Sequence, residues 1–383
     1  MKARLMTTKT KEYGAVSLFI VIFTMLLVTV ITVSFIRIML SDQRQATAAD
    51  LSQSAYDSAQ AGVEDAKRAL LNYQSECASG DALRCSTALA AINSTTCNEA
   101  LKSVIDYLPG KEVLVQQTAG DAALQQAYTC VKITRQTDDY LGVLNQDDSK
   151  LIQLVGAASF DSVHIEWFSA KDIQGTNVDV PNFSSGTPLL SQTRWAPNRP
   201  SLMRTQLIQF GNKFTLGDFE DVNASSQSNA NTLFLYPSTI VDSPKSFVNN
   251  ARKVATGSGP TLVHCQNSLS AGGYACSATI TLQTPTNGGN RTAYLRLTSL
   301  YKKANYRVTL LTAAGVPVKF DGVQPQVDST GRANDLFRRV QSRVEMTDAD
   351  FPYPDAAVSS TGNFCKDFLV TNNTADYANN CTP

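Results

Sequence analysis

The longest apolar stretch of the chain runs from Gly14 to Ile36, and it holds no charged side chain. The 22 residues from Ala15 to Ile36 would form an α-helix of roughly 33 Å, which is long enough to cross the hydrocarbon core of a bilayer. Arg37 ends the stretch, and residues 1–14 before it carry four Lys/Arg and one Glu. This pattern predicts a transmembrane helix with its basic N-terminus in the cytoplasm and the long C-terminal part exported.

The helical pattern continues beyond the apolar stretch. Between Ser41 and Tyr73 there is no proline, and Gly62 is the only glycine. Apolar residues recur there at spacings of three and four, which is the pattern of an amphipathic α-helix. The stripe consists of Leu51, Ala55, Ala59, Val63, Ala66, Leu70 and Tyr73. We therefore predict one helix from Ala15 to about Gln74, with a transmembrane first half and an amphipathic second half whose small residues allow a partner to approach closely.

From Ala127 onward the apolar period changes to two, the period of β-strands. The expected strands cover residues 127–133, 163–168, 276–282, 291–300, 306–310 and 336–346. The segment 286–290, which reads Thr-Asn-Gly-Gly-Asn, predicts a hairpin turn between two of them. The fold class expected from these patterns is α+β: a long N-terminal helix followed by a mainly antiparallel sheet, or two packed sheets, across about 127–350.

The patterns divide the chain into five segments. They are a basic leader (1–14), the long helix (15–75), a mixed helical subdomain with cysteines (76–126), a β-rich domain (127–350) and a C-terminal tail (351–383). Two long polar loops, 169–200 and 218–231, fall inside the β-rich domain. Long loops on a rigid scaffold commonly carry binding function, so these loops are the candidate adhesive surface.

The eight cysteines all follow the apolar stretch. They are Cys77, Cys85, Cys97, Cys130, Cys265, Cys276, Cys365 and Cys381. An even number on one side of a membrane segment predicts disulfides in an oxidising compartment. Unpaired core cysteines are the alternative, and zinc is disfavoured because no Cys-x-x-Cys occurs. Many pairings are open, of which nearest-neighbour pairing is the simplest; Cys365–Cys381 would then close a loop in the tail.

Composition and motifs argue against several classes of function. The formal net charge is zero, and the residues after the basic leader carry a slight acidic excess, so the basic surface that nucleic-acid binding needs is missing. His164 and His264 are the only histidines, and no catalytic or nucleotide-binding motif surrounds them. Asp348, Asp350 and Asp355 offer oxygen ligands for calcium without an EF-hand pattern. We expect no enzyme, no cofactor and no metal site.

Two short motifs resemble a known family. The leader ends Lys11-Glu12-Tyr13-Gly14 directly before the apolar stretch, and the later helical stretch Ala55–Ala66 contains Ala-Gln-Ala-Gly-Val-Glu-Asp-Ala. Together they resemble a type IV prepilin, and in particular the N-terminal region of PilX-type minor pilins. The resemblance covers residues 11–75, about a fifth of the chain. Gln60 departs from the family pattern, which has glutamate there.

The resemblance implies a processing site and a set of partners. A prepilin peptidase would cut after Gly14 and leave Ala15 as a methylated N-terminus. The mature subunit would then move from the inner membrane into an extracellular filament, where its helix packs against other pilin subunits, with a host or surface ligand as a further partner. Most pilins have glutamate five residues after the cut, where this chain has Phe19. Because that glutamate offsets a neighbouring terminal amine, Phe19 favours a position at the filament tip over a repeated one.

Two other functions fit the same sequence. A single-pass membrane-anchored binding protein outside any filament would have the same residues 2–37 and would keep its N-terminus. A membrane-tethered hydrolase is the third hypothesis, and the scarcity of histidine argues against it.

Overall fold

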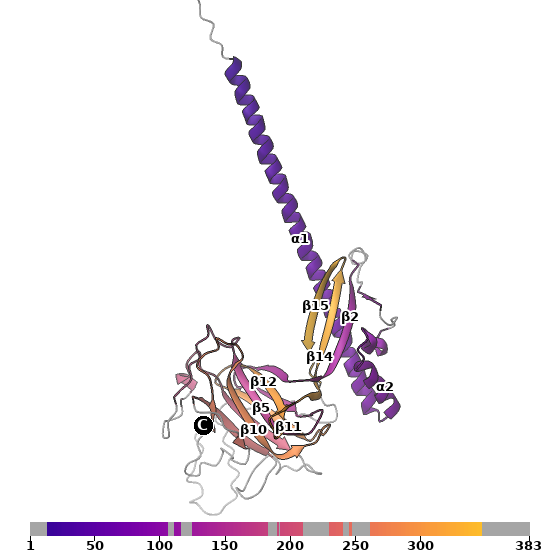
Figure 1. Ribbon diagram of the computed structural model, residues 1–383, viewed down its shortest axis with the longest axis vertical. Helices are drawn as coiled ribbons and strands as arrows, with labels where there is room; N and C mark the ends of the chain where they lie inside the picture. Colours follow the sequence, from indigo (N-terminus) through magenta and orange to yellow (C-terminus); the bar gives the residue numbers. More distant parts are fainter. Residues whose placement is uncertain are drawn as a thin grey trace, which may run out of the picture. The chain divides into compact units, whose positions relative to one another are not determined.

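A computed structural model of the chain describes residues 14–105, 111–115, 125–182, 190, 192–209, 230–239, 245–246 and 261–346 (Figure 1). Residues 1–13 of the expected leader and the whole tail 351–383 lie outside the described residues. The fold is α+β, as predicted: one long N-terminal helix is followed by mainly antiparallel strands and disulfides.

The chain forms two compact units. The first, here called the helix–sheet unit, comprises Met1–Lys132 and Asp328–Gln341, and the second, the sandwich unit, comprises Ile133–Val327 and Ser342–Pro383. The sandwich unit is thus inserted within the sequence of the helix–sheet unit. This division differs from the expected one, in which residues 127–350 form one β-rich domain, because the first and last strands of that region belong with the helix.

The helix–sheet unit combines one long helix with a four-stranded sheet. Its elements are α1 (Gly14–Ala78), α2 (Ala82–Ile92), the 3-10 helix η1 (Glu99–Ser103), β1 (Val113–Leu114), β2 (Ala127–Thr137), β14 (Phe320–Ala333) and β15 (Leu336–Arg343). The strand order is β1-β2-β14-β15, and β2 and β14 continue beyond this unit into the sandwich unit. The 65 residues of α1 confirm the prediction of one helix that includes both the apolar stretch and the amphipathic stripe.

Small residues bring α1 close to the sheet. The side chains of Ala55, Ala59 and Val63 are buried, as the amphipathic pattern predicts. At Gly331 on β14, a Cβ atom would lie 2.2 Å from both the Ala55 carbonyl oxygen and the Ala59 nitrogen. At Gly62 on α1, a Cβ atom would lie 2.4 Å from the Ser329 hydroxyl. Gly331 is therefore required for this close helix–sheet contact because the atoms it faces are backbone atoms, whereas a side chain at Gly62 would require neighbouring side chains to shift.

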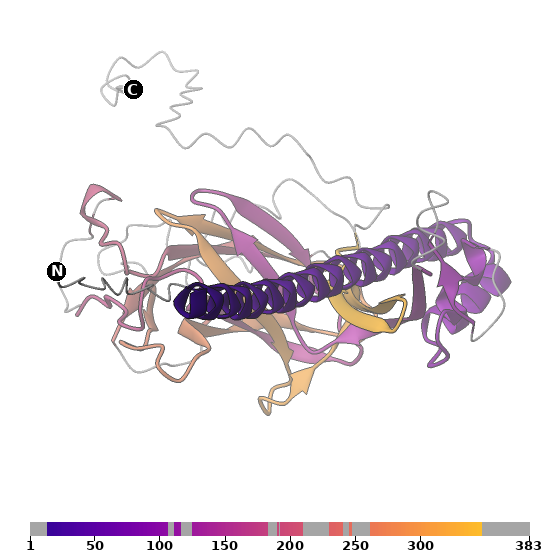
Figure 2. The same ribbon diagram turned by 90° about the horizontal axis from the view of Figure 1, so that it is seen from above.

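The sandwich unit contains two sheets that enclose one core (Figure 2). Its further elements are β3 (Tyr140–Leu144), β4 (Ser149–Gln153), β5 (Phe160–Ser169), the 3-10 helix η2 (Gln192–Arg194), β6 (Leu202–Gln209), β7 (Ala230–Ser238), β8 (Lys245–Ser246), β9 (Thr261–His264), β10 (Tyr274–Thr286), β11 (Ala293–Leu300), β12 (Ala304–Leu311) and β13 (Pro317–Val318). One sheet has the order β13-β12-β5-β10-β8, with β3 also paired to β12, and the other β4-β11-β6-β7-β9. Alternating residues such as Val163, Ile165 and Trp167 fill the core between them.

The hairpin predicted at residues 286–290 is wrong. β10 pairs with β5 and β8, whereas β11 pairs with β4 and β6 in the other sheet, so the chain crosses between sheets at this turn. The Gly289 amide donates to the Gly156 carbonyl oxygen at 2.9 Å, and a Cβ atom at Gly288 would lie 3.0 Å from Ala158 Cα. The two glycines therefore allow the crossover to pack closely against the segment before β5. A crossover of this kind and a hairpin turn can have the same glycine-rich composition.

Three disulfides are present in the described residues: Cys77–Cys85, Cys97–Cys130 and Cys265–Cys276. Each joins nearest neighbours in the sequence, which confirms the simplest of the predicted pairings. Cys365 and Cys381 lie outside the described residues. Cys77–Cys85 and Cys97–Cys130 belong to the helix–sheet unit, and Cys265–Cys276 belongs to the sandwich unit.

Candidate functional site

The first half of α1 projects without any packing partner in the structure. Every described side chain from Leu18 to Asp50 is exposed, and the first fully buried residue of the helix is Ala55. Large apolar side chains such as Phe19 and Phe35 are 72% and 67% exposed. The helix is long and apolar enough to span a membrane once, and its apolar window is not buried by the chain itself. The projecting half therefore requires an apolar environment that the rest of the chain does not supply.

The hydroxyl groups in this segment are satisfied within the helix. Thr24 donates to the Ile20 carbonyl oxygen at 2.9 Å and Thr32 to that of Val28 at 2.7 Å, and Thr29 and Ser34 make equivalent bonds. A hydroxyl group that entered lipid or a helical bundle unpaired would carry a free-energy cost. Because these hydroxyls already have acceptors, the segment can enter an apolar environment at little polar cost.

The residues predicted for processing lie at the start of α1. The helix begins at Gly14, with Ala15 as its second residue, and the side-chain environments of both lie outside the described residues. Phe19 lies in the next turn, and its side chain is largely exposed. Gln60, the other departure from the family pattern, donates to the Tyr56 hydroxyl at 2.7 Å on the helix surface.

The packed half of α1 contains a polar contact that the sequence did not suggest. The Tyr128 hydroxyl on β2 donates to an Asp65 carboxylate oxygen at 2.8 Å, and the Tyr128 ring lies against Gly62. Burial and the hydrogen bond to Asp65 raise the pKa of Tyr128, so that its hydroxyl stays protonated and keeps donating. This bond adds a polar contact to the packing of Ala55, Ala59 and Val63, which places one side of α1 against the sheet.

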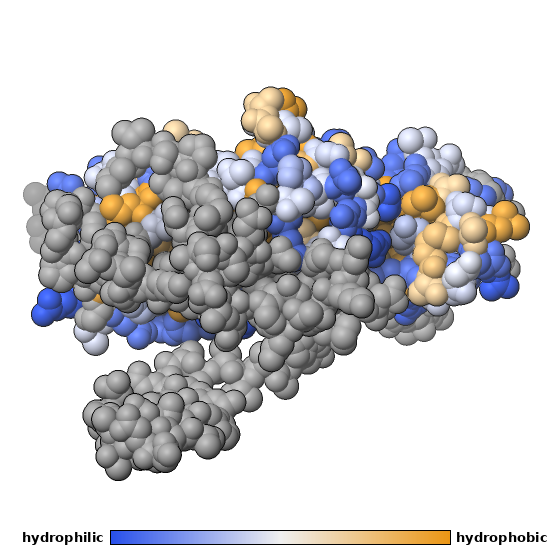
Figure 3. Space-filling model, turned by 90° about the horizontal axis from the view of Figure 1, so that it is seen from below, coloured by the Kyte–Doolittle hydropathy of each residue, from blue (hydrophilic) through white to orange (hydrophobic). Residues whose placement is uncertain are grey.

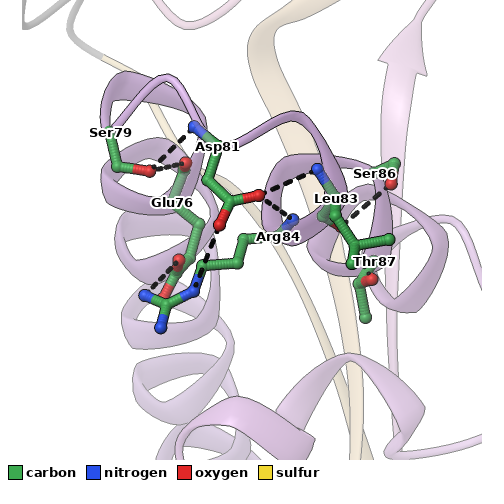
Figure 4. Close-up of polar contacts among 7 residues, drawn as sticks. All are labelled: Glu76, Ser79, Asp81, Leu83, Arg84, Ser86 and Thr87. Carbon is green, nitrogen blue, oxygen red and sulfur yellow. Dashed lines mark hydrogen bonds and ion pairs between the residues drawn. The ribbon is translucent and has the colours of Figure 1, made fainter.

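The end of α1 forms a short hairpin with α2 (Figure 4). The Asp81 carboxylate accepts from the Leu83 and Arg84 amides at 3.0 and 3.1 Å and caps α2. Arg84 in turn lies 3.6 Å from both Asp81 and Glu76, and the Cys77–Cys85 disulfide closes the turn. A groove of about 650 Å³ is lined by α1, α2 and η1. Apolar residues also gather on the surface of this hairpin, at the right of Figure 3.

The described part of loop 169–200 in the sandwich unit is fixed by an aromatic cluster. Trp195 is buried, and its indole nitrogen donates to the Pro200 carbonyl oxygen at 3.0 Å. The rings of Tyr236 and Tyr301 contact its ring edge to face, and the Arg199 guanidinium lies 5.3 Å from its centroid. These contacts hold the part of the predicted adhesive loop around Trp195 against the sandwich unit. Most of loop 218–231 lies outside the described residues.

The structure does not bring the two histidines into a catalytic arrangement. His164 on β5 is half-buried, and its Nδ1 atom lies 2.9 Å from the Thr279 hydroxyl. His264 is the last residue of β9, on a strand of the other sheet. Within the described ranges, no group of three or more His, Cys, Asp and Glu side chains could hold a metal ion. Asp348, Asp350 and Asp355 lie outside those ranges.

Comparison of the chain with protein-family models, with curated proteins and with solved structures finds no match in any of the three.

Proposed function

We propose that the protein is a non-enzymatic minor pilin or pseudopilin, positioned at or near the tip of a type IV filament and involved in its assembly and in surface adhesion. The observation that carries the proposal is the division of α1 into two halves. The first half is apolar and exposed on all sides, and the second packs through Ala55, Ala59 and Gly62 onto an antiparallel sheet. A subunit held by its helix in a membrane and later in a helical bundle needs both halves.

The continuity of α1 favours a filament subunit over a simple anchor. A membrane anchor joined to an exported domain functions equally well through a flexible linker, and here no break separates the two halves over 65 residues. A continuous helix instead transmits the orientation of the sheet to the projecting half. At position 19 the chain has phenylalanine where most pilins have glutamate, so no carboxylate is available there to offset the terminal amine of a neighbouring subunit. This substitution suits a position at the end of a filament better than one in a long run of identical subunits.

The sandwich unit supports the adhesive part of the proposal. It is inserted between β2 and β14, and its two sheets form a rigid core that supports long loops. Loops held by such a core are suited to bind a host or environmental surface. The alternative function, a single-pass anchored extracellular binding protein, uses the same unit without a filament.

Mass spectrometry of the mature N-terminus tests the proposal. We expect the protein to begin at Ala15, with a methyl group on its amine, and to purify with filaments. A Gly14→Ile variant should keep the leader and stay in the membrane fraction, because a bulky side chain then occupies the cleavage position. A wild-type protein that retains Met1 or Lys2 would exclude the pilin proposal and favour the membrane-anchored binding protein.

A further inference from the structure

A group of basic side chains lies beside the aromatic cluster of the sandwich unit. Arg199, from loop 169–200, and Lys302, from the turn that joins β11 to β12, form its centre. Arg194 and Lys303 flank them in the sequence, and both are exposed. In the part of the chain that the structure describes, the four cations have one carboxylate within ion-pair distance, that of Asp179, which lies 2.8 Å from Arg199. The group therefore carries an excess of positive charge.

Arg199 and Lys302 act on each other electrostatically. The Lys302 ammonium donates to the Pro197 carbonyl oxygen, two residues before Arg199. Burial, and after it the positive charge of Arg199, lowers the pKa of Lys302, and the charge of Asp179 offsets only part of this shift. Two cations thus share one carboxylate. A bound anion would stabilise this arrangement, because it would reduce the repulsion between them.

The four cations can serve a ligand in different ways. The Arg199 side chain is only 11% exposed, so it acts chiefly through its charge. Lys302 is half-buried, and its ammonium has one acceptor among the described residues, although it carries three N–H donors. The exposed Arg194 and Lys303 add further donors on either side. Charge-assisted hydrogen bonds from these donors would hold a carboxylate or sulfate group.

The turn that presents Lys302 has an unusual backbone conformation. Tyr301 adopts φ of 73°, a region that large side chains rarely occupy. Its backbone amide donates to the Asp147 carboxylate at 3.3 Å, and its ring contacts that of Trp195. The Ser299 hydroxyl donates to the Lys302 carbonyl oxygen at 2.7 Å. Strained residues that the surrounding contacts maintain are common at functional sites, and here they fix the direction in which Lys302 leaves the turn.

The neighbouring groups favour a polysaccharide as the source of the anionic groups. Tyr301 is half-buried, so part of an amphipathic aromatic side chain borders Lys302. Such a side chain suits a sugar ring, which has both apolar faces and hydroxyl groups. Nucleic acid requires a larger basic surface than four cations provide, and the residues after the leader carry a slight acidic excess.

We propose that Lys302, with Arg194, Arg199 and Lys303, forms a binding site for an acidic polysaccharide, whose carboxylate or sulfate groups bind the Lys302 ammonium. This site rests on the adhesive part of the proposed function and names the chemical class of the surface that is bound. It also gives the described part of loop 169–200 a direct role, because that loop supplies two of the four cations.

Binding of the detergent-solubilised full chain to defined polymers tests the site. We expect the chain to bind polygalacturonate, which carries carboxylates, or dextran sulfate, and the tighter of the two identifies the anionic group. Neutral dextran should not bind. Binding should weaken roughly tenfold between low and high salt, because exposed charges are screened. Equally tight binding of poly-L-glutamate would assign the site to an acidic peptide and would overturn the proposed polysaccharide.

Substitutions at Lys302 connect binding to this site. Lys302→Gln should weaken binding of the anionic polymer at least fivefold, whereas Lys302→Arg keeps the charge and should retain the binding. Lys319→Gln is the matched control, because Lys319 is exposed and follows β13, which pairs with the other end of β12. It removes the same charge and should leave binding unchanged. Arg194→Gln with Lys303→Gln changes only exposed side chains and should weaken binding at least threefold.

The outcomes separate this site from the filament proposal. Equal binding by the wild type and Lys302→Gln, or equal losses in Lys302→Gln and Lys319→Gln, would overturn the site. A chain that begins at Ala15 and purifies with filaments, yet binds neither anionic polymer, would overturn the site and leave the filament proposal intact. A chain that keeps its leader but binds polygalacturonate through Lys302 would overturn the filament proposal alone.

Discussion

At the scale of single residues, Asn98 joins a loop to the sheet of the helix–sheet unit. It is fully buried and adopts a left-handed backbone conformation with φ of 64°. Its backbone amide donates to the Val131 carbonyl oxygen, and its side-chain oxygen accepts from the Val131 amide at 2.7 Å. Its side-chain amide donates to the carbonyl oxygens of Lys111 and Thr129. Asparagine is one of the few residues that tolerates this conformation and also supplies a donor and an acceptor.

Replacement of Asn98 should therefore be costly. In Asn98→Ala the Val131 amide and the Lys111 carbonyl lose their buried partners, and alanine is strained at positive φ, so we expect a loss of about 3 kcal/mol in the free energy of unfolding. Asn98→Gly removes the same hydrogen bonds without the backbone strain and should lose about 1 kcal/mol less. Urea unfolding of the detergent-solubilised protein measures both. Equal losses in the two variants would show that the backbone conformation contributes nothing.

At the scale of elements, the contact between α1 and β14 depends on glycine at a point where backbone meets backbone. A side chain at Gly331 would overlap the Ala55 carbonyl oxygen and the Ala59 amide, neither of which can move without a shift of the helix. At Gly62 the nearest atoms belong instead to the side chains of Ser329 and Val131, which can move.

The two glycines should respond differently to substitution. We expect Gly331→Ala to cost about 3 kcal/mol or more in unfolding free energy, because overpacking here displaces a whole helix. Gly62→Ala should cost less, since side chains can adjust and alanine adds roughly 1 kcal/mol of helix propensity. Thermal unfolding of the two variants side by side gives the comparison. A Gly62→Ala variant less stable than Gly331→Ala would contradict this account of the contact.

Apolar periodicity predicted the long elements well and their partners poorly. The stripe from Leu51 to Tyr73 identified the sheet-facing side of α1, because helical spacing alone determines which side chains share a face. The run from Cys276 to Leu282 identified a strand, but nothing in its pattern states which sheet the next strand joins, and the predicted hairpin at 286–290 was wrong for that reason. The departure from the family pattern at Phe19 could be read directly from the sequence, because it depends on a single residue at a fixed distance from Gly14.

At the scale of the whole molecule, the fold is a helix–sheet unit that carries a second unit within its sequence. The chain enters the sandwich unit after Lys132 on β2 and re-enters the helix–sheet unit at Asp328 on β14. β2 and β14 are hydrogen-bonded neighbours in one sheet. The pKa of the Asp328 carboxyl is lowered mainly by the hydrogen bond from Arg339. The positive charge of Lys132 lies close enough to lower it further. The two ends of the insertion therefore lie side by side, which is the geometry of a short hairpin.

Removal of the inserted unit should leave the helix–sheet unit folded. We expect a chain in which Asn-Gly replaces residues 133–327 to form a β2–β14 hairpin, because that dipeptide favours the two-residue turns that join antiparallel neighbours. The shortened chain keeps Cys77–Cys85 and Cys97–Cys130 and the whole α1–sheet contact, so it should unfold cooperatively and enter filaments while losing surface adhesion.

Truncation after Val327, which removes β14 and β15 from the sheet, is the matched control and should not fold. If the shortened chain also failed to fold, the helix–sheet unit would depend on the sandwich unit for its stability; if it folded and still adhered, adhesion would belong to the helix–sheet unit.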